Sequence, residues 1–175
     1  MKFVALLRGI NVGKSIQVPM KQLKILLESL GYSNVITYLN SGNALFESDE
    51  SAFVITNAIE STLELTFGQR IKTLVKSFDD MVNIAQSIPP DWTNDTTQQT
   101  YVAYLFKEIA TPNIIDDLPI KREFMSIFYQ HECLIWNIKR ENYNKSQITK
   151  LASHASYAAM TTRNANTARK LIALY

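Results

Sequence analysis

The stretch VITYLNSGNALFE, residues 35–47, reads as two short strands joined by a tight turn. Residues 35–39 and 44–47 are mostly apolar, β-branched or aromatic, whereas residues 40–43 are the small polar and glycine types that occupy turns. A hairpin here means that strands and helices do not simply alternate along the chain. The segment therefore favours an antiparallel α+β sheet over a parallel nucleotide-binding sheet.

The segments that flank this hairpin extend the pattern. Residues 2–7 form a continuous apolar run typical of a buried strand, and leucines recur at helical spacing between Pro19 and Gly31. Ser48, Asp49 and Ser51 are candidate N-caps for a longer helix that ends at Gly68, and residues 70–76 alternate as a strand. The order is β-α-β-β-α-β, which is the ferredoxin-like split unit.

The rest of the chain repeats that order. Ser77 and Asp80 predict a capping box for a short helix that ends near residue 88, followed by a polar connection. Further elements are then expected as strands at 101–106, 123–129, 133–138 and 157–161, and as helices at 112–118, 146–153 and 164–174. The predicted fold is α+β, with two ferredoxin-like β-α-β-β-α-β subdomains related by duplication, plus a C-terminal helix.

The predicted division places the first subdomain at residues 1–76, a helix and linker at 77–100, and the second subdomain with the C-terminal helix at 101–175. The duplication is inferred from element order alone, because the two halves share little residue-level similarity.

Composition narrows the class of protein. The chain has 175 residues, 46% of them hydrophobic and 19% charged, with a net charge of +2, which is ordinary for a globular protein with a core. No run of lysines or arginines marks a dedicated duplex-DNA binder. The single cysteine, Cys133, excludes an internal disulfide, and the absence of a secretory leader pattern predicts a cytoplasmic location. No apolar stretch reaches the roughly 20 residues of a membrane span.

Residues Gly9 to Ser15 superficially match a phosphate-binding P-loop. A Walker A motif needs four residues between its glycines, but only three separate Gly9 from Gly13. The following helix should also begin at once, whereas Pro19 places its start several residues later. The segment is therefore expected to be an ordinary loop.

Three separated motifs nevertheless resemble a known bacterial family. They are LLRGINVG at residues 6–13, SGN at 41–43 and TTRN at 161–164, the last followed by Asn166-Thr167 and Lys170-Leu171. In that order they are similar to the motifs of the family known only as domain of unknown function 1697. The resemblance implies two ferredoxin-like subdomains and no established activity. The sequence departs from the pattern at Lys14, Ala165 and Ala168, where a glycine, a tryptophan and a valine are usual.

The first candidate site is a polar corner built from two segments. In a ferredoxin-like sheet the first and third strands are antiparallel neighbours, so Arg8 and Asn11 should lie beside Ser41 and Asn43. One cation, two amides and a hydroxyl suit an anionic or polar ligand. The alternative is that the glycines permit tight turns and the polar side chains cap loose backbone groups.

The second candidate is Thr162, Arg163 and Asn164, expected at the start of the last helix. A helix N-terminus presents free N–H groups and partial positive charge, so these residues suit an anion. The alternative is a threonine N-cap with a solvated or paired arginine.

Other residue groups point to no chemistry. The two histidines and the cysteine lack metal-ligand spacing. Tyr38 and Phe46 could stack on bases, but their surroundings do not match an RNA-recognition module and favour packing. No nucleophile or general base can be assigned, no cofactor is indicated, and the oligomeric state is not specified.

Three functions remain open. They are a binding module for a small anionic or phosphorylated ligand, a single-stranded nucleic-acid binder, and a structural or protein-interaction domain without a ligand.

Overall fold

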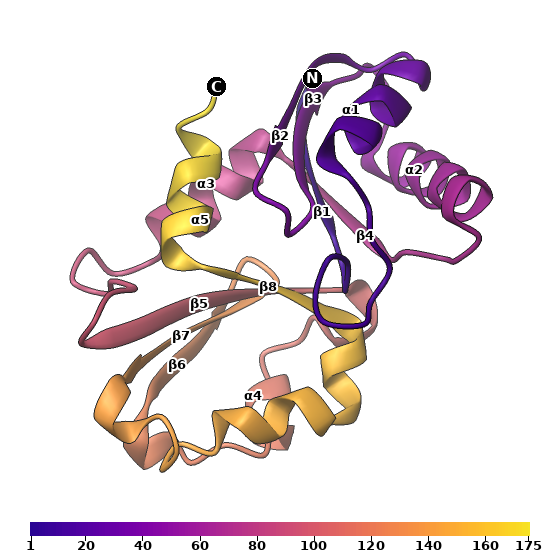
Figure 1. Ribbon diagram of the computed structural model, residues 1–175. Coiled ribbons are helices and arrows are strands. Elements are labelled where there is room, and N and C mark those ends of the chain that lie inside the picture. Colours follow the sequence, from indigo (N-terminus) through magenta and orange to yellow (C-terminus); the bar gives the residue numbers. More distant parts are fainter. The chain divides into compact units, whose positions relative to one another are not determined.

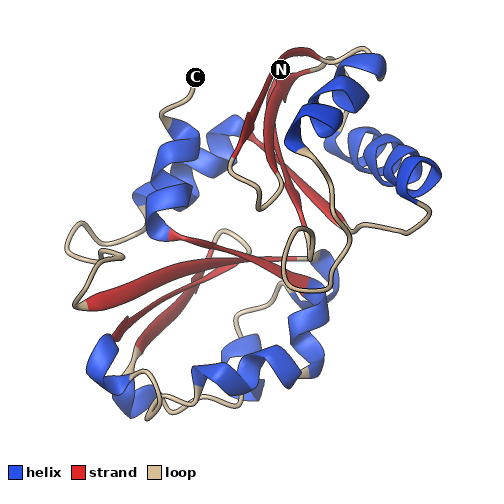
Figure 2. Ribbon diagram, in the orientation of Figure 1, coloured by secondary structure: helices blue, strands red, loops and turns tan.

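The computed structural model describes all of residues 1–175, and the chain divides into two compact units, Met1–Met81 and Val82–Tyr175. Each unit contains one four-stranded antiparallel sheet with helices on it (Figure 1, Figure 2). No helix is long and apolar enough to cross a bilayer.

The first unit has the strand order β2-β3-β1-β4. Its elements are β1 (Lys2–Leu7), α1 (Met20–Ser29), β2 (Ser33–Tyr38), β3 (Asn43–Glu47), α2 (Ala52–Phe67) and β4 (Thr73–Ser77). This is the order of a ferredoxin-like sheet, with strands one and three paired at its centre. The sequence prediction of the split unit is confirmed.

One face of this sheet carries the core of the first unit. Alternate residues of β1 and β3 point to the same face because side chains alternate along a strand. Phe46 of β3 stacks on Tyr32, with ring centroids 4.8 Å apart, and helix α2 adds Ile55, Ile59 and Leu63, all fully buried. The core thus joins both helices to the central strands.

Local signals set the limits of α2. The Ser51 hydroxyl accepts a hydrogen bond from Val54 N at 3.4 Å, as an N-cap should. At the other end Gly68 is left-handed, with φ of 69°, and its N–H donates to Glu64 O at 2.8 Å. The predicted end at Gly68 is confirmed, and of the three candidate N-caps Ser51 is the one that caps the helix.

Helix α3 (Phe78–Gln86) follows β4 directly. The predicted cap at Ser77 is confirmed, because its hydroxyl accepts from Asp80 N at 3.1 Å and donates to the Asp80 carboxylate at 2.6 Å. The helix ends two residues earlier than the predicted limit at residue 88.

The second unit has the strand order β6-β7-β5-β8, which is the same topology. Its elements are β5 (Gln98–Leu105), η1 (Lys107–Ile109), α4 (Ile114–Asp117), η2 (Arg122–Phe124), β6 (Ser126–Gln130), β7 (Cys133–Lys139), η3 (Arg140–Asn142), η4 (Ile148–Ser153), η5 (Ala155–Ala159), β8 (Met160–Asn164) and α5 (Ala165–Ile172). The fold is therefore two ferredoxin-like arrangements with a C-terminal helix, as predicted.

Several predicted limits in this unit are wrong. The helix predicted at 146–153 is a 3₁₀ segment, η4, which begins after Gln147 with φ of 58°. Strand β8 lies three residues later than the predicted 157–161, because residues 155–159 form η5. In the first unit, β4 begins at Thr73 and not at Arg70.

Candidate functional site

Sheet register brings the loop after β1 and the turn before β3 together. Leu6 pairs with Asn43 in the antiparallel ladder, and Leu7 N donates to Gly42 O at 2.8 Å. The segments that contain Arg8 and Ser41 are thus neighbours although more than thirty positions separate them.

A third segment, outside the sequence motifs, reaches the same end of the sheet. Strand β4 pairs with the other edge of β1, and Arg8 N donates to Lys72 O at 2.9 Å. The ferredoxin-like strand order contains this information, because its fourth strand always flanks the first. Residues 8–19, 39–43 and 70–72 together are called the basic corner below.

Asn11 holds the loop of the basic corner in shape. Its Nδ2 donates to Val18 O at 2.9 Å and to Asn40 O at 2.7 Å, and its Oδ1 accepts from Val18 N at 2.7 Å. The backbone of Asn11 is left-handed, with φ of 56°, a conformation that asparagine tolerates better than most residues. Its amide therefore closes the loop and ties it to the neighbouring turn.

Asn43 plays a similar part in the hairpin. The side chain is fully buried, and its Nδ2 donates to Tyr38 O at 2.8 Å and to Ser41 Oγ at 3.0 Å. A buried amide must find such partners, since an unsatisfied one costs about 1–3 kcal/mol. Asn43 thus fixes the turn between β2 and β3, and Ser41 is positioned by it.

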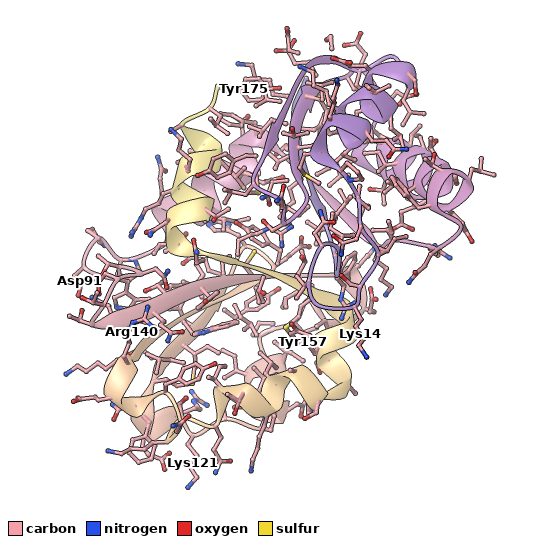
Figure 3. All side chains as sticks on the ribbon, in the orientation of Figure 1. Lys14, Asp91, Lys121, Arg140, Tyr157 and Tyr175 are labelled. Atoms are coloured by element: carbon pink, nitrogen blue, oxygen red, sulfur yellow. The ribbon has the colours of Figure 1, made fainter.

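The charges of the basic corner all have one sign. Its three segments carry Arg8, Lys14, Arg70 and Lys72, and contain no aspartate or glutamate. Arg8 is half-buried, whereas both lysines are exposed; Lys14 lies on the loop after β1 (Figure 3).

One carboxylate reaches the corner from helix α2. Glu60 Oε2 lies 3.1 Å from Arg70 Nη2, and Glu60 Oε1 accepts from Thr73 N at 2.8 Å. Glu60 therefore neutralises Arg70 and caps the start of β4. Arg8, Lys14 and Lys72 are the other basic residues of the corner.

The TTRN motif lies in the second unit, and its predicted position at the start of the last helix is right for Asn164 and wrong for Thr162 and Arg163. Thr162 and Arg163 belong to strand β8, paired with Ala103 and Val102 of β5. Helix α5 begins only at Ala165, with Asn164 as its N-cap, whose Oδ1 accepts from Thr167 N at 2.8 Å. Extended pairing with β5 places Thr162 and Arg163 in a strand, so Asn164 and not Thr162 caps the helix.

Side chains of this motif alternate between the two sheet faces. Arg163 is 6% exposed, and its Nη1 donates to Thr161 Oγ1 at 2.9 Å and to Thr162 O at 2.8 Å. Burial lowers the pKa of the Arg163 guanidinium to about 10, and the nearby Tyr104 partly opposes that shift. Thr162 points to the opposite face and is half-buried.

Arg163 has one buried ionisable neighbour in its own unit, the Tyr104 phenol. Tyr104 is fully buried, and its hydroxyl has no hydrogen-bond partner. Burial raises the pKa of the Tyr104 phenol well above its usual range, with Cys133 adding to the shift and Arg163 opposing it. Tyr104 is therefore neutral at any physiological pH.

Aromatic stacking on a nucleic acid finds no support from Phe46. Its ring is fully buried in the core of the first unit, so it cannot meet a base. Nowhere in residues 1–175 do three histidine, cysteine, aspartate or glutamate side chains gather as a metal-binding set.

The predicted site residues thus fall into two groups. Arg8, Asn11, Ser41 and Asn43 lie together at one end of the first unit. The TTRN residues lie in the second unit, on both faces of its sheet.

Comparison with known proteins identifies the family of the chain and supports its fold. The model of the family described as "Protein of unknown function (DUF1697)" matches residues 1–136, so the chain belongs to that family. No curated protein matches. A solved structure, of the conserved bacterial protein SP0830 from Streptococcus pneumoniae, is 24% identical and superimposes with a TM-score of 0.83. The match covers 98% of this chain and 96% of that one, and it shows the fold.

Proposed function

We propose that this member of the DUF1697 family is a binding module for a small anionic ligand, such as a phosphorylated metabolite, held at the basic corner. The observation that carries the proposal is the charge of the corner. Arg8, Lys14 and Lys72 belong to segments that meet at one end of the sheet and contain no acidic residue. Clustered like charges favour an anion that neutralises them.

The rigidity of the corner supports the same function. Loop and turn are cross-linked by Asn11, and Arg8 is anchored at its backbone by Lys72 O. A site whose backbone is already ordered loses less entropy when a ligand binds. In this proposal Asn11 and Asn43 are positioning residues, whereas Arg8 contacts the ligand.

Arginine suits this role because its guanidinium is planar. It presents paired N–H donors that match two oxygens of a phosphate or carboxylate. A charge-assisted hydrogen bond of this kind contributes about 1.5–3 kcal/mol, so loss of Arg8 should weaken binding at least tenfold.

The test is calorimetric titration with inorganic phosphate, pyrophosphate, sugar phosphates, dicarboxylates and short oligonucleotides. Oligonucleotides carry the same phosphate, so a hit of that class would show a steep dependence on salt and would favour nucleic-acid binding. A binding isotherm with a small anion, lost in Arg8→Gln, is the expected result.

Arg122→Gln provides the matched control. Arg122 lies in the second unit, its side chain is 59% exposed, and it pairs with Asp116 at 3.1 Å. The same substitution there removes one positive charge without touching the corner. The proposal is refuted if no anion binds, or if Arg8→Gln and Arg122→Gln bind it equally well.

A further inference from the structure

The face of the second sheet that is covered by η4 and η5 contains a cavity of about 190 Å³. Strands supply its floor through Gln99, Tyr101, Trp136 and Thr162, and the segment after β7 supplies its walls through residues such as Tyr143 and Tyr157. Every lining side chain is uncharged.

The cavity arises where the second unit departs from the first. In the first unit the connection between the third and fourth strands is the sixteen-residue helix α2, whose buried side chains fill the sheet face. In the second unit the same connection consists of the short segments η3, η4 and η5. Short 3₁₀ turns present fewer side chains to the sheet than a continuous helix, and the face is left incompletely covered.

The cavity opens to solvent through its walls. Thr149, Ala152 and Tyr157 line it and are themselves solvent-exposed, and they belong to η4 and η5. A ligand can therefore enter between these two turns without unfolding of the core.

Aromatic rings dominate the lining. Tyr101 and Trp136 are direct cross-strand partners on β5 and β7, with ring centroids 5.9 Å apart and planes inclined by 25°. Tyr143 and Tyr157 face them from the cover. Ring faces of this kind attract flat ligands by offset stacking or edge-on contact.

Two polar groups in the floor of the cavity have donors and acceptors available for a ligand. The side-chain amide of Gln99 and the hydroxyl of Thr162 form no hydrogen bond within the protein. An amide offers a donor and an acceptor side by side, the pattern that reads the adjacent donor and acceptor of adenine. The hydroxyl adds a third contact on the neighbouring strand.

Size sets a limit on the ligand. A cavity of about 150 Å³ is known to hold one benzene ring, so 190 Å³ suits one or two fused rings but not a bulky chain. The absence of charge in the lining disfavours an ionic group inside it.

We propose that this cavity is a binding site for a planar, uncharged nitrogen heterocycle of one or two rings, with adenine as the type compound. Tyr101 and Trp136 contact the ring faces or edges, Gln99 binds the donor–acceptor edge, and Thr162 donates to a ring nitrogen. This site uses none of the residues of the basic corner, so the proposal does not depend on whether an anion binds there.

Tryptophan fluorescence offers a direct probe. The chain has only two tryptophans, Trp92 and Trp136, so Trp92→Phe leaves Trp136 as the sole reporter, within the cavity. In this background adenine is expected to change the emission saturably. Benzimidazole serves as a ring of similar shape with its own donor and acceptor on opposite sides, and because it fluoresces in the ultraviolet its binding is followed by calorimetric titration.

Gln99→Leu separates hydrogen bonding from stacking. The affinity for adenine should fall at least tenfold. The affinity for benzimidazole, which cannot present an adjacent donor and acceptor, should change less than threefold. Gln130→Leu is the matched control, because Gln130 is exposed on β6 and does not line the cavity. Thr162→Val is a second variant, in which the side chain keeps nearly the same volume, and it should also lower the affinity for adenine.

The circular dichroism spectrum and melting temperature establish that each variant is folded. The proposal is overturned if adenine leaves Trp136 emission unchanged at millimolar concentration and calorimetric titration detects no binding of benzimidazole. It is equally overturned if folded Gln99→Leu and Thr162→Val bind adenine as well as the Gln130→Leu control does.

Discussion

Replacing Gly42 by alanine should damage the first unit more than any other glycine-to-alanine change in it. Gly42 has φ of 77°, in the left-handed region, where a residue with a Cβ costs about 1–2 kcal/mol. A Cβ at this position would also lie 2.7 Å from Leu7 Cβ and 2.8 Å from Ile10 Cδ1.

Both neighbours are held in place. Leu7 is 1% exposed and Ile10 is 2% exposed, so neither can move aside without disturbing the core. Overpacking of this kind costs about 1–3 kcal/mol. Together with the backbone term, Gly42→Ala should lower the free energy of unfolding by about 2–5 kcal/mol.

Gly68→Ala isolates the backbone term. Gly68 has nearly the same φ, 69°, but nothing lies within 4 Å of a Cβ built on it. It should therefore lose only about 1–2 kcal/mol. Urea unfolding followed by far-ultraviolet circular dichroism gives both values, provided that the slope of free energy against urea is unchanged. Equal losses in the two variants would refute the steric explanation.

Three further predictions concern the first unit. Asn11→Ala removes three hydrogen bonds and should lower the free energy of unfolding by about 2–4 kcal/mol, measured by urea unfolding; a loss below 1 kcal/mol would show that the loop holds its shape without them. Glu60→Ala leaves the buried Thr73 N–H without its acceptor and should cost about 1.5–3 kcal/mol, whereas Arg70→Ala, at a 70% exposed side chain, should cost less than about 1 kcal/mol in the same assay. Burial, aided by the charge of Glu50 and a hydrogen bond to it, raises the pKa of Tyr32 to about 12. Because the unfolded phenol titrates near pH 10, the stability contributed by neutral Tyr32 should be complete below about pH 10 and lost between about pH 10 and 12. Unfolding free energies measured from pH 9 to 12 should therefore fall less steeply in Tyr32→Phe than in the parent chain.

Topology was predictable from sequence because it depends on signals that are local. The turn at residues 40–43 and the caps at Ser51 and Gly68 each mark an element boundary through their own conformational preferences. Once the β-α-β-β-α-β order was known, the pairing of β1 with β3 followed, and with it the proximity of Arg8 to Ser41.

The roles of the polar side chains were not predictable to the same degree. Asn11 was expected either to face a ligand or to cap loose backbone groups, and its amide contacts Val18 O and Asn40 O. Those carbonyls lie seven and twenty-nine positions away, and nothing in the sequence reports which backbone groups a loop leaves without partners. The expected turn-holding alternative describes Asn11 and Asn43 well.

The strand position of Thr162 and Arg163 was not predictable for a different reason. Thr162 is both a good helix N-cap and a good strand residue, so local preference does not decide between the two. Pairing with β5, a contact made across some sixty positions, makes the choice. The 3₁₀ segments that lie over the second sheet were likewise not predictable, because no sequence signature marks the left-handed conformation of Gln147, which interrupts the predicted helix.

The two proposed sites differ in their physical basis, and this difference gives a way to separate them in the intact chain. Binding at the basic corner would depend on Arg8 and on exposed lysines, whose attraction for an anion is screened within about 8 Å at physiological ionic strength. Binding in the second-unit cavity would depend on ring contacts and on hydrogen bonds to neutral groups, which salt screens little. A tenfold rise in sodium chloride, from about 0.05 M to about 0.5 M, shortens the screening length from over 10 Å to a few ångströms. It should therefore weaken the binding of an anion and leave the binding of adenine nearly unaffected. The same topology, built twice with different loops and covers, would then bind two ligands by different forces.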